Sequence, residues 1–330
     1  MTVNITIVGL GQIGTSVGLG LANQTELLRR TGHDRDLDVA RRAEKMGALD
    51  RVEVNLPTAV RDADLVLLSL PMDQIRDTMS LIAQDLKEGA VVMDTGPVKE
   101  IVAAWAGELL PSGRYYVGLT PVINPAYLHG SDSGVEAAHE DLFRGGLMAI
   151  VTPPRSSSEA IKLAADLTRI LGATPLFADP IEIDSLMAAT HLLPQLMAAT
   201  LLNITVDQPG WHEARKVAGR AYAEVTTPVV HFSEPQNLST AVLLNRENML
   251  RLMDSMIAAM QAIRNDIEAQ DEAALEERLG RARRGWDTWW KQRQAGDWIN
   301  EAAPSLADVT GPGIFGRLLG GMGRKPKNKK

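Results

Sequence analysis

The stretch NITIVGLGQIG, residues 4–14, joins a short apolar run to a G-x-G-x-x-G motif. The run over residues 4–10 is rich in isoleucine and valine, which favours a β-strand. A helix is expected over residues 13–23, directly after the first glycines. A glycine motif between a strand and a helix is typical of a dinucleotide-binding turn, because the start of the helix offers unpaired N–H groups to phosphate.

Each glycine of the motif has a separate expected role. Gly9 permits the tight turn, Gly11 lets the backbone approach a pyrophosphate, and Gly14 lets the helix pack close to the strand. The sequence therefore predicts a cofactor site formed by Gly9, Gly11, Gln12, Ile13, Gly14, Asp34, Leu70 and Pro71.

Asp34 indicates which dinucleotide is bound. It lies 20 residues beyond Gly14, where a carboxylate at the end of the second strand binds the ribose 2′-hydroxyl and repels a 2′-phosphate. This position predicts NAD as the cofactor. Arg29, Arg30 and Arg35 flank Asp34 and offer positive charge to a phosphate, so NADP stays open.

Apolar runs and helical patterns alternate over the first half of the chain. Continuous apolar runs predict strands that are covered on both faces. The alternation predicts a Rossmann-like, doubly wound parallel sheet, with a dinucleotide-binding domain at residues 1–179. After the first strand, further strands are expected at residues 64–70, 90–96, 115–119 and 147–153, and helices at residues 72–86 and 158–171.

The β-like runs stop after residue 184, and the chain that follows is predicted to be almost entirely helical. We expect an all-α substrate and dimerisation domain at residues 180–310, with its longest helix over residues 239–268. Residues 185–206 carry no formal charge, and we interpret them as a helix buried within this domain or within a dimer rather than a membrane span. The basic, glycine-rich residues 311–330 predict a disordered tail.

The composition excludes several classes of function. The chain has 330 residues, a net charge of −7 and no cysteine. The acidic balance argues against a nucleic-acid binder, and the lack of cysteine excludes disulfides and zinc–thiolate sites. The first apolar run has no basic segment before it, which argues against a signal peptide and predicts a cytoplasmic protein without a membrane partner.

The chain contains, in order, the blocks IVGLGQIGTSVGLGL, DADLVLLSLPMDQI, VVMDTGPVKE, SGVEAAHEDLFRGG and LGATPLFADPIEIDSLMAATHLLPQLMAA. Their order and spacing resemble the prephenate/arogenate dehydrogenase family, the oxidoreductases of tyrosine biosynthesis. The resemblance runs from residue 3 to about residue 260. It implies a Rossmann-like domain joined to a helical domain that intertwines two chains into a homodimer.

The resemblance also implies a reaction, the NAD(P)-dependent oxidative decarboxylation of a small acid. A hydride passes from the ring carbon that bears the hydroxyl to the nicotinamide, and the ring carboxylate leaves as CO₂. A histidine accepts a hydrogen bond from the hydroxyl, which helps because negative charge builds on that oxygen as hydride departs. No metal is needed, since aromatisation drives the decarboxylation.

The resemblance breaks at the site of chemistry in the first domain. The position of the family's histidine acceptor is Thr120, which forms hydrogen bonds but does not take a proton at neutral pH. The serine of the family's Gly-Ser-Val-Lys block is Pro97, while Lys99 remains and is expected to offer positive charge to an anionic substrate. The stretch VINPAYLHG is longer than the family block by about five residues and carries Asn124 and His129 towards the nicotinamide or into solvent.

The helical domain departs from the family as well. His191 matches the first histidine of a His-Leu-Pro-His motif, and Pro194 or Gln195 replaces the second. His191 is interpreted either as a site residue or as a hydrogen-bonded core histidine. The block that carries the family's substrate-binding arginine corresponds to residues 225–228, which contain no arginine. Arg220 is a candidate replacement, within its own chain or across a dimer interface.

Three functional outcomes follow from these departures. The pocket has rebuilt its acceptor from another group, it acts on a different small acid, or the chain is a non-catalytic NAD-binding sensor or scaffold. The catalytic candidates are His191, Thr120, Lys99 and His129, and the substrate-binding candidates are Gln195, Asn124 and Arg220.

Overall fold

The computed structural model describes residues 2–24, 26, 28–130, 132–153, 156–231 and 234–296. The chain divides into two compact units, Met1–Asp271 and Glu272–Lys330. In the second unit the described part is the helix α13 (Glu272–Ala295). The predicted disordered tail at residues 311–330 lies outside the described residues, and the predicted domain boundary at residue 179 falls within the first unit.

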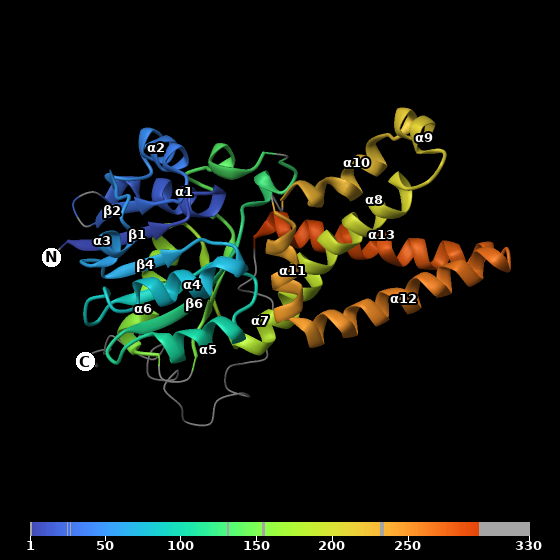
Figure 1. Ribbon diagram of the computed structural model, residues 1–330. Helices are drawn as coiled ribbons and strands as arrows, with labels where there is room; N and C mark the ends of the chain where they lie inside the picture. The colour runs from blue at the N-terminus through green and yellow to red at the C-terminus, as the bar shows by residue number, and fades with distance from the viewer. Residues whose placement is uncertain are drawn as a thin grey trace, which may run out of the picture. The chain divides into compact units, whose positions relative to one another are not determined.

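An eight-stranded sheet forms the centre of the nucleotide-binding half (Figure 1). The strands lie in the order β3-β2-β1-β4-β5-β6-β7-β8. Their numbering falls from β3 to β1 and then rises from β4 to β8. The strands are β1 (Val3–Val8), β2 (Leu28–His33), β3 (Arg51–Val52), β4 (Leu65–Leu68), β5 (Val91–Asp94), β6 (Tyr115–Val122), β7 (Leu147–Val151) and β8 (Thr174–Ala178).

The predicted doubly wound sheet is confirmed, with one correction to its strand directions. Every neighbouring pair is parallel except β6 and β7, which pair antiparallel with Thr120 opposite Ala149. Over its described residues, 123–130 and 132–146, the connection between these two strands contains only the short 3₁₀ segments η2 (Pro125–Tyr127) and η3 (Gly134–Ala137). A parallel connection usually needs a crossover helix, so a connection without one returns the chain in the opposite direction.

Helices cover both faces of the sheet because successive strand residues point to opposite sides. Ile7, Leu67 and Met93 belong to one apolar core, which is closed by α1 (Gln12–Gly20), α2 (Leu37–Lys45) and α6 (Ser158–Ile170). Val66 and Val92 belong to a second core on the other face. That core is closed by α3 (Leu56–Val60), α4 (Met72–Ile82) and α5 (Glu100–Leu109).

The remaining helices of the first unit form the predicted helical region. It consists of α7 (Pro180–Met187), the π-helical turn η4 (Ala188–Leu192), α8 (Leu193–Val206), α9 (Trp211–Val217), α10 (Arg220–Thr226), the 3₁₀ segment η5 (Thr227–His231), α11 (Pro235–Leu244) and α12 (Arg246–Glu268). The predicted single helix over residues 239–268 is wrong, because the chain breaks at Asn245. The amide Nδ2 of Asn245 donates to the Asp184 carbonyl oxygen at 2.7 Å.

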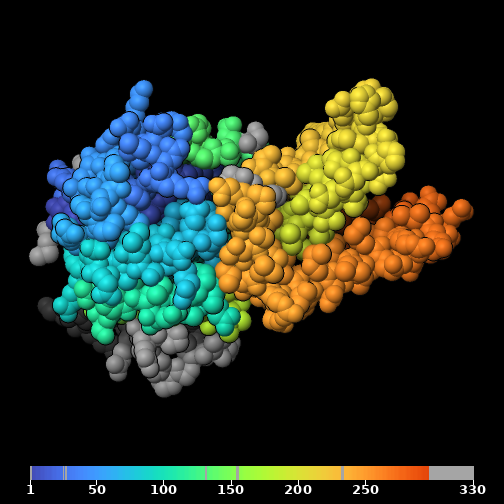
Figure 2. Space-filling view, viewed as in Figure 1, coloured from blue at the N-terminus to red at the C-terminus, as the bar shows by residue number. Residues whose placement is uncertain are grey.

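Strand ends at the carboxyl edge of the sheet differ from the predicted ones. The strands expected to reach residues 70 and 96 end at Leu68 and Asp94, so the residues after each of them form turns. α11 packs against α4, the helix that follows the first of these turns (Figure 2). The turns therefore face the helical region.

One helix over the described residues, Pro180–Val206, is long and apolar enough to cross a membrane by length and composition alone. Only 22% of its most apolar window is buried in the chain. The single chain therefore does not supply the burial expected for residues 185–206, and burial within a dimer stays a prediction.

Candidate active site

The glycine turn after β1 has the backbone geometry expected of a dinucleotide site. Gly9 has a φ of 89°, and a Cβ there would lie 2.3 Å from the Ser69 oxygen. A Cβ on Gly14 would lie 2.0 Å from the Gly9 oxygen, so only glycine lets the helix approach the turn this closely. A Cβ on Gly11 would meet no atom of the described chain within 4 Å, which leaves open space above the turn.

The start of α1 points its unpaired amides at this open space. Gly11 precedes the helix, and no side chain caps its end. Gln12 and Ile13 open the helix. The side-chain Nε2 of Gln12 donates to the Ala137 carbonyl oxygen at 3.1 Å, so this side chain turns towards η3. Backbone amides at a helix start bind phosphate, and the geometry fits a pyrophosphate here.

Asp34 lies directly after β2, as expected. Its Oδ2 accepts from the Leu10 amide at 2.8 Å and its Oδ1 accepts from the Asp36 amide at 2.9 Å. These bonds fix the carboxylate beside the glycine turn. Each carboxylate oxygen keeps a further lone pair for a ribose hydroxyl, so the residues present fit a dinucleotide.

The arginines next to Asp34 have partners of their own. Arg30 is buried and holds Asp50 at 2.7 Å, while it also donates to the Gly18 and Gly47 oxygens. The expectation that Arg30 is able to meet a phosphate is therefore wrong. Arg35 is exposed and forms an ion pair with Glu234 at 2.9 Å.

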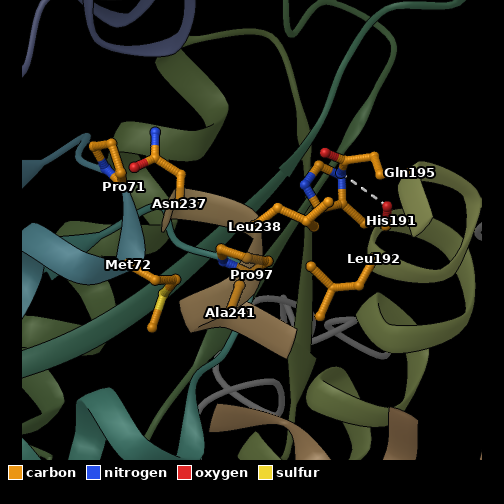
Figure 3. Close-up of a pocket in the computed structure, with 9 residues that line it drawn as sticks. All are labelled: Pro71, Met72, Pro97, His191, Leu192, Gln195, Asn237, Leu238 and Ala241. Atoms are coloured by element: carbon orange, nitrogen blue, oxygen red, sulfur yellow. Dashed lines mark hydrogen bonds between the residues drawn. The ribbon is translucent and has the colours of Figure 1, made fainter. Parts of the chain in front are cut away.

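A pocket of about 90 Å³ lies between the carboxyl edge of the sheet and the helical region (Figure 3). Pro71 and Pro97 come from the turns after β4 and β5 and form one side of it. The other side comes from the π-helical turn, α8 and α11. The lining residues are Pro71, Met72, Pro97, His191, Leu192, Gln195, Asn237, Leu238 and Ala241.

His191 lies in the π-helical turn, a local irregularity that occurs frequently at functional sites. Its side chain lies beside Gln195, whose Nε2 donates to the His191 carbonyl oxygen at 2.9 Å (Figure 3). The residue is exposed to solvent and lines the pocket. Protein atoms around the ring displace water that would solvate its charged form, and this desolvation lowers the pKa of His191 below its usual value. The electrostatic effect of the nearby His231 acts in the same direction. His191 is therefore neutral at pH 7.

Three polar atoms near this edge find no hydrogen-bond partner within the described chain. The first is the hydroxyl of Thr120, whose residue on β6 is 3% exposed. The second is Oδ1 of Asn237, which lines the pocket and lies beside Pro71 in Figure 3. The third is Oδ1 of Asp73, in the first turn of α4. Buried polar atoms usually have partners, so these atoms are candidates to meet a ligand.

Lys99 does not face the pocket, which corrects its expected placement. The side chain is 0% exposed, and Nζ forms an ion pair with Asp94 Oδ2 at 2.7 Å. The Tyr116 hydroxyl donates to the other oxygen of Asp94 at 2.6 Å. Burial lowers the pKa of Lys99, and the Asp94 carboxylate opposes this shift. Lys99 thus stabilises the turn after β5 rather than offering charge to a substrate.

Asp184 connects the helical region to that same turn. Its carboxylate accepts the backbone N–H groups of Lys99 and Glu100, where α5 begins. Burial raises the pKa of Asp184 to about 6, although these two hydrogen bonds act in the opposite direction. The Asp184 carboxylate therefore holds α7 against the start of α5, where a negative charge is favourable.

Three other candidates lie away from the pocket lining. His129 is exposed in the loop after η2, and the Asn124 amide group bonds to the Asp141 oxygen and the Ala126 amide. Arg220 is exposed on α10 and pairs with Glu224 at 2.7 Å. The inserted loop folds against residues 139–141 rather than into the pocket, because Tyr127 stacks on His139 with ring centroids 4.2 Å apart and its hydroxyl donates to Asp141 Oδ1 at 2.6 Å. In the described residues, no group of three or more histidines or acids is arranged to hold a metal.

Several pocket residues were not expected from the sequence. Pro97 was noted only as a replaced serine, and Asn237 had no motif to indicate it. The remaining residues that sequence reasoning missed are apolar side chains, which are indistinguishable from core residues before the fold is known: Met72, Leu192, Leu238 and Ala241.

The sheet order, the glycine turn and the pocket against a helical region define a dinucleotide-binding protein of the two-domain dehydrogenase class. The family model described as "Prephenate dehydrogenase, nucleotide-binding domain" matches residues 17–175, and "Prephenate dehydrogenase, dimerization domain" matches residues 179–281. The chain belongs to the prephenate dehydrogenase family, a family of dehydrogenases.

Individual relatives agree with this assignment. A prephenate dehydrogenase of Bacillus subtilis is 24% identical over 82% of this chain and 72% of the relative. A cyclohexadienyl dehydrogenase of Zymomonas mobilis is 26% identical over 81% of this chain and 89% of the relative. Among solved structures, a prephenate dehydrogenase from A. aeolicus in complex with hydroxyphenyl propionate and NAD+ has a TM-score of 0.76 at 21% identity, over 87% of this chain and 98% of that one.

Proposed function

We propose that this protein is an NAD-dependent dehydrogenase that oxidises and decarboxylates a cyclohexadienyl acid such as prephenate or arogenate. The family assignment supports the reaction type, and the pocket at the carboxyl edge of the sheet supports the place where it occurs. The observation that carries the proposal is the combination of Gly11, with its open space, and the fixed Asp34 carboxylate. The A. aeolicus relative was solved with NAD+.

The cofactor residues have separable tasks in this proposal. The amides of Gln12 and Ile13 would hold the pyrophosphate, and Asp34 would accept the ribose hydroxyls. A bound nicotinamide supplies a hydride acceptor. Pro71 and Pro97, in the turns after β4 and β5, line the pocket and would limit access of water to the ring.

His191 is the residue that we propose to accept the hydrogen bond from the substrate hydroxyl. It is neutral at pH 7, because its pKa is lowered, and a neutral imidazole is able to accept a proton. The Gln195 amide fixes the turn that holds it. Thr120 has a hydroxyl with no partner in the described chain, and it assists as a hydrogen-bonding group but not as a base.

We propose that the negative charge of the substrate carboxylates is balanced by a residue from outside the pocket lining. None of the described residues that line the pocket is a lysine or an arginine. We propose a homodimer through the helical domain, in line with the family's dimerization domain. In that assembly Arg220, on the exposed helix α10, is the candidate to reach the partner's pocket.

The test combines cofactor binding with turnover. NADH titration should give a saturable complex, and NAD reduction should appear with prephenate or L-arogenate. His191→Ala should lower kcat/KM by about 10²–10⁴ with unchanged NADH binding, which is the usual cost of losing a general base. His212→Ala, an exposed histidine on α9, is the matched control. Full activity of the His191 variant would discard the assignment of the acceptor.

Thr120 at the family's acceptor position favours a second candidate, a nucleotide-binding protein without turnover. In that case NADH binds with ordinary affinity, and no member of a panel of cyclohexadienyl and other small hydroxy acids yields product. A dehydrogenase for a different small acid would instead reduce NAD with one panel member other than prephenate and arogenate.

A further inference from the structure

An ion pair joins the cofactor loop to the helical region beside Asp34. Arg35 follows Asp34 in the chain, and its Nη2 lies 2.9 Å from Oε1 of Glu234. Glu234 directly precedes α11, the helix that carries Asn237 into the pocket. Both side chains are accessible to solvent, with 70% and 46% of their surface exposed.

The position of Arg35 bears on cofactor selection. An arginine close to the ribose-binding carboxylate is the group that usually accommodates the 2′-phosphate of NADP. Arg30 is unable to do so, since it is buried against Asp50. The Arg35 guanidinium is exposed and one residue from Asp34, but Glu234 already neutralises it. The three side chains Asp34, Arg35 and Glu234 therefore carry a net charge of −1.

We infer that Glu234 is a specificity-determining residue that excludes NADP. It holds the Arg35 guanidinium and adds a second carboxylate near the ribose end of the cofactor site. A 2′-phosphate would have to displace Glu234 from Arg35 and would meet two carboxylates, whereas a ribose hydroxyl meets neither cost. The inference rests on the proposed dinucleotide-binding function, and it assigns a selectivity role to a residue of the helical domain.

Glu234 contributes little to folding stability. An exposed ion pair contributes little to folding stability, because water solvates both charges in either state. Glu234 occupies the N-cap position of α11, yet its side chain makes no cap hydrogen bond. Glu234→Gln is therefore expected to fold like the wild type.

The experiment measures dissociation constants for NADH and NADPH by fluorescence titration of the full chain at one fixed, low salt concentration. Glu234→Gln should tighten NADPH binding by about tenfold, since a charge-assisted arginine–phosphate contact becomes available, and leave NADH within about twofold. Adding Arg35→Gln should abolish the gain. Glu268→Gln, which frees the remote Arg264 on α12 with the same change of charge, should leave both constants unchanged.

The outcomes separate this inference from the function on which it rests. An NADPH constant that is the same in Glu234→Gln and wild type overturns the inference, as does an equal gain in Glu268→Gln. Tight NADPH binding that is lost in Arg35→Gln alone also overturns it, because Arg35 would then serve the phosphate in the presence of Glu234. Absence of NADH binding in every variant instead removes the proposed function.

Discussion

His191 receives its chemical character from three features of its surroundings. The π-helical turn directs it towards the pocket, Gln195 bonds to its backbone, and the surrounding protein atoms favour the uncharged ring. A histidine ring accepts a hydrogen bond only when it is neutral. The kcat/KM of the protein should therefore be constant above the pKa of His191 and fall as the pH drops through that pKa. The lowered pKa extends the active range towards acid.

A substitution at His231 tests this electrostatic environment. His231 is the second cause of the lowered pKa of His191, so His231→Gln should raise that pKa. The acid limb of the kcat/KM profile should move to higher pH. NMR titration of the His191 ring gives the same answer without activity, and His212→Gln is the control. An unmoved His191 titration would show that His231 has no electrostatic influence on it.

Residue identity alone decided some of the candidates and misled on others. Gly9, Gly11 and Gly14 were predictable because their roles depend on local backbone geometry. Lys99 was not predictable, since the carboxylate that neutralises it lies on β5 and the tyrosine that completes the group lies on β6. A lysine after a strand looks the same in sequence whether it points into a pocket or into the core.

The turn between β1 and α1 yields a contrast between two glycines of one motif. Gly11→Ala should fold normally, because nothing in the described chain lies within 4 Å of the new Cβ, but the methyl group would occupy the space expected for the pyrophosphate. NADH binding should weaken at least about tenfold, or about 1.4 kcal/mol. Gly14→Ala should instead lower the free energy of unfolding by about 1–3 kcal/mol, since its Cβ would lie 2.0 Å from the Gly9 oxygen.

Thermal unfolding and NADH titration of both variants check this contrast. If Gly11→Ala bound NADH like the wild type, the open space above the turn would not be the phosphate site. If Gly14→Ala kept wild-type stability, the close approach of α1 to the turn would be dispensable.

The contact between α7 and the start of α5 predicts a pH dependence of stability. The pKa of Asp184 is about 6 in the folded chain against 3.8 as a model value, so the folded state holds its proton more tightly. Stability from this group is present below the lower pKa and is lost as the pH rises through the higher one. The loss amounts to at most roughly 3 kcal/mol, because one pKa unit corresponds to about 1.4 kcal/mol.

Chemical unfolding of Asp184→Asn between pH 4 and pH 7 measures this loss. The variant has no titrating group at position 184. Its free energy of unfolding should therefore decline less with rising pH than that of the wild type. Asp179→Asn, which changes the exposed cap of α7, serves as the control. Equal slopes in Asp184→Asn and wild type would contradict the assignment.

Element types were predictable from sequence, and their ends were not. The alternation of apolar runs located β1, β4, β5, β6 and β7, while β2, β3 and β8 were not assigned residue ranges. β2 contains Arg29, Arg30 and Gly32, which hide an apolar pattern, and the charge of the buried Arg30 is compensated by Asp50. The direction of β7 depends on the lack of a crossover helix, which is a property of the connection and not of the strand.

At the scale of the whole molecule, α12 points to an assembly. It is 23 residues long and buries only Met249 of its own residues. Leu250, Ile257, Met260 and Ile267 are 46–62% exposed and share one helix face through spacings of seven and three. Exposed apolar stripes of this kind usually mark protein–protein contacts, and the family's dimerization domain covers this helix.

Charges placed on this stripe should separate the two chains of the proposed homodimer. Ile257→Glu combined with Met260→Glu should shift the mass measured by light scattering from dimer to monomer, because two carboxylates per chain would be buried without partners. Leu81→Glu, at an equally exposed site on α4, is the control. A dimeric double variant would place the interface elsewhere.

The π-helical turn at residues 188–192 fits one residue more into a turn than an α-helix does. In a regular α-helix an extra residue would rotate everything that follows it by about 100°. The wide turn absorbs the extra residue, so α8 keeps nearly the phase that it would have without it, and the residues within the turn, His191 among them, change their direction. A single inserted residue thus re-aims the histidine without changing the direction in which a second copy is able to approach.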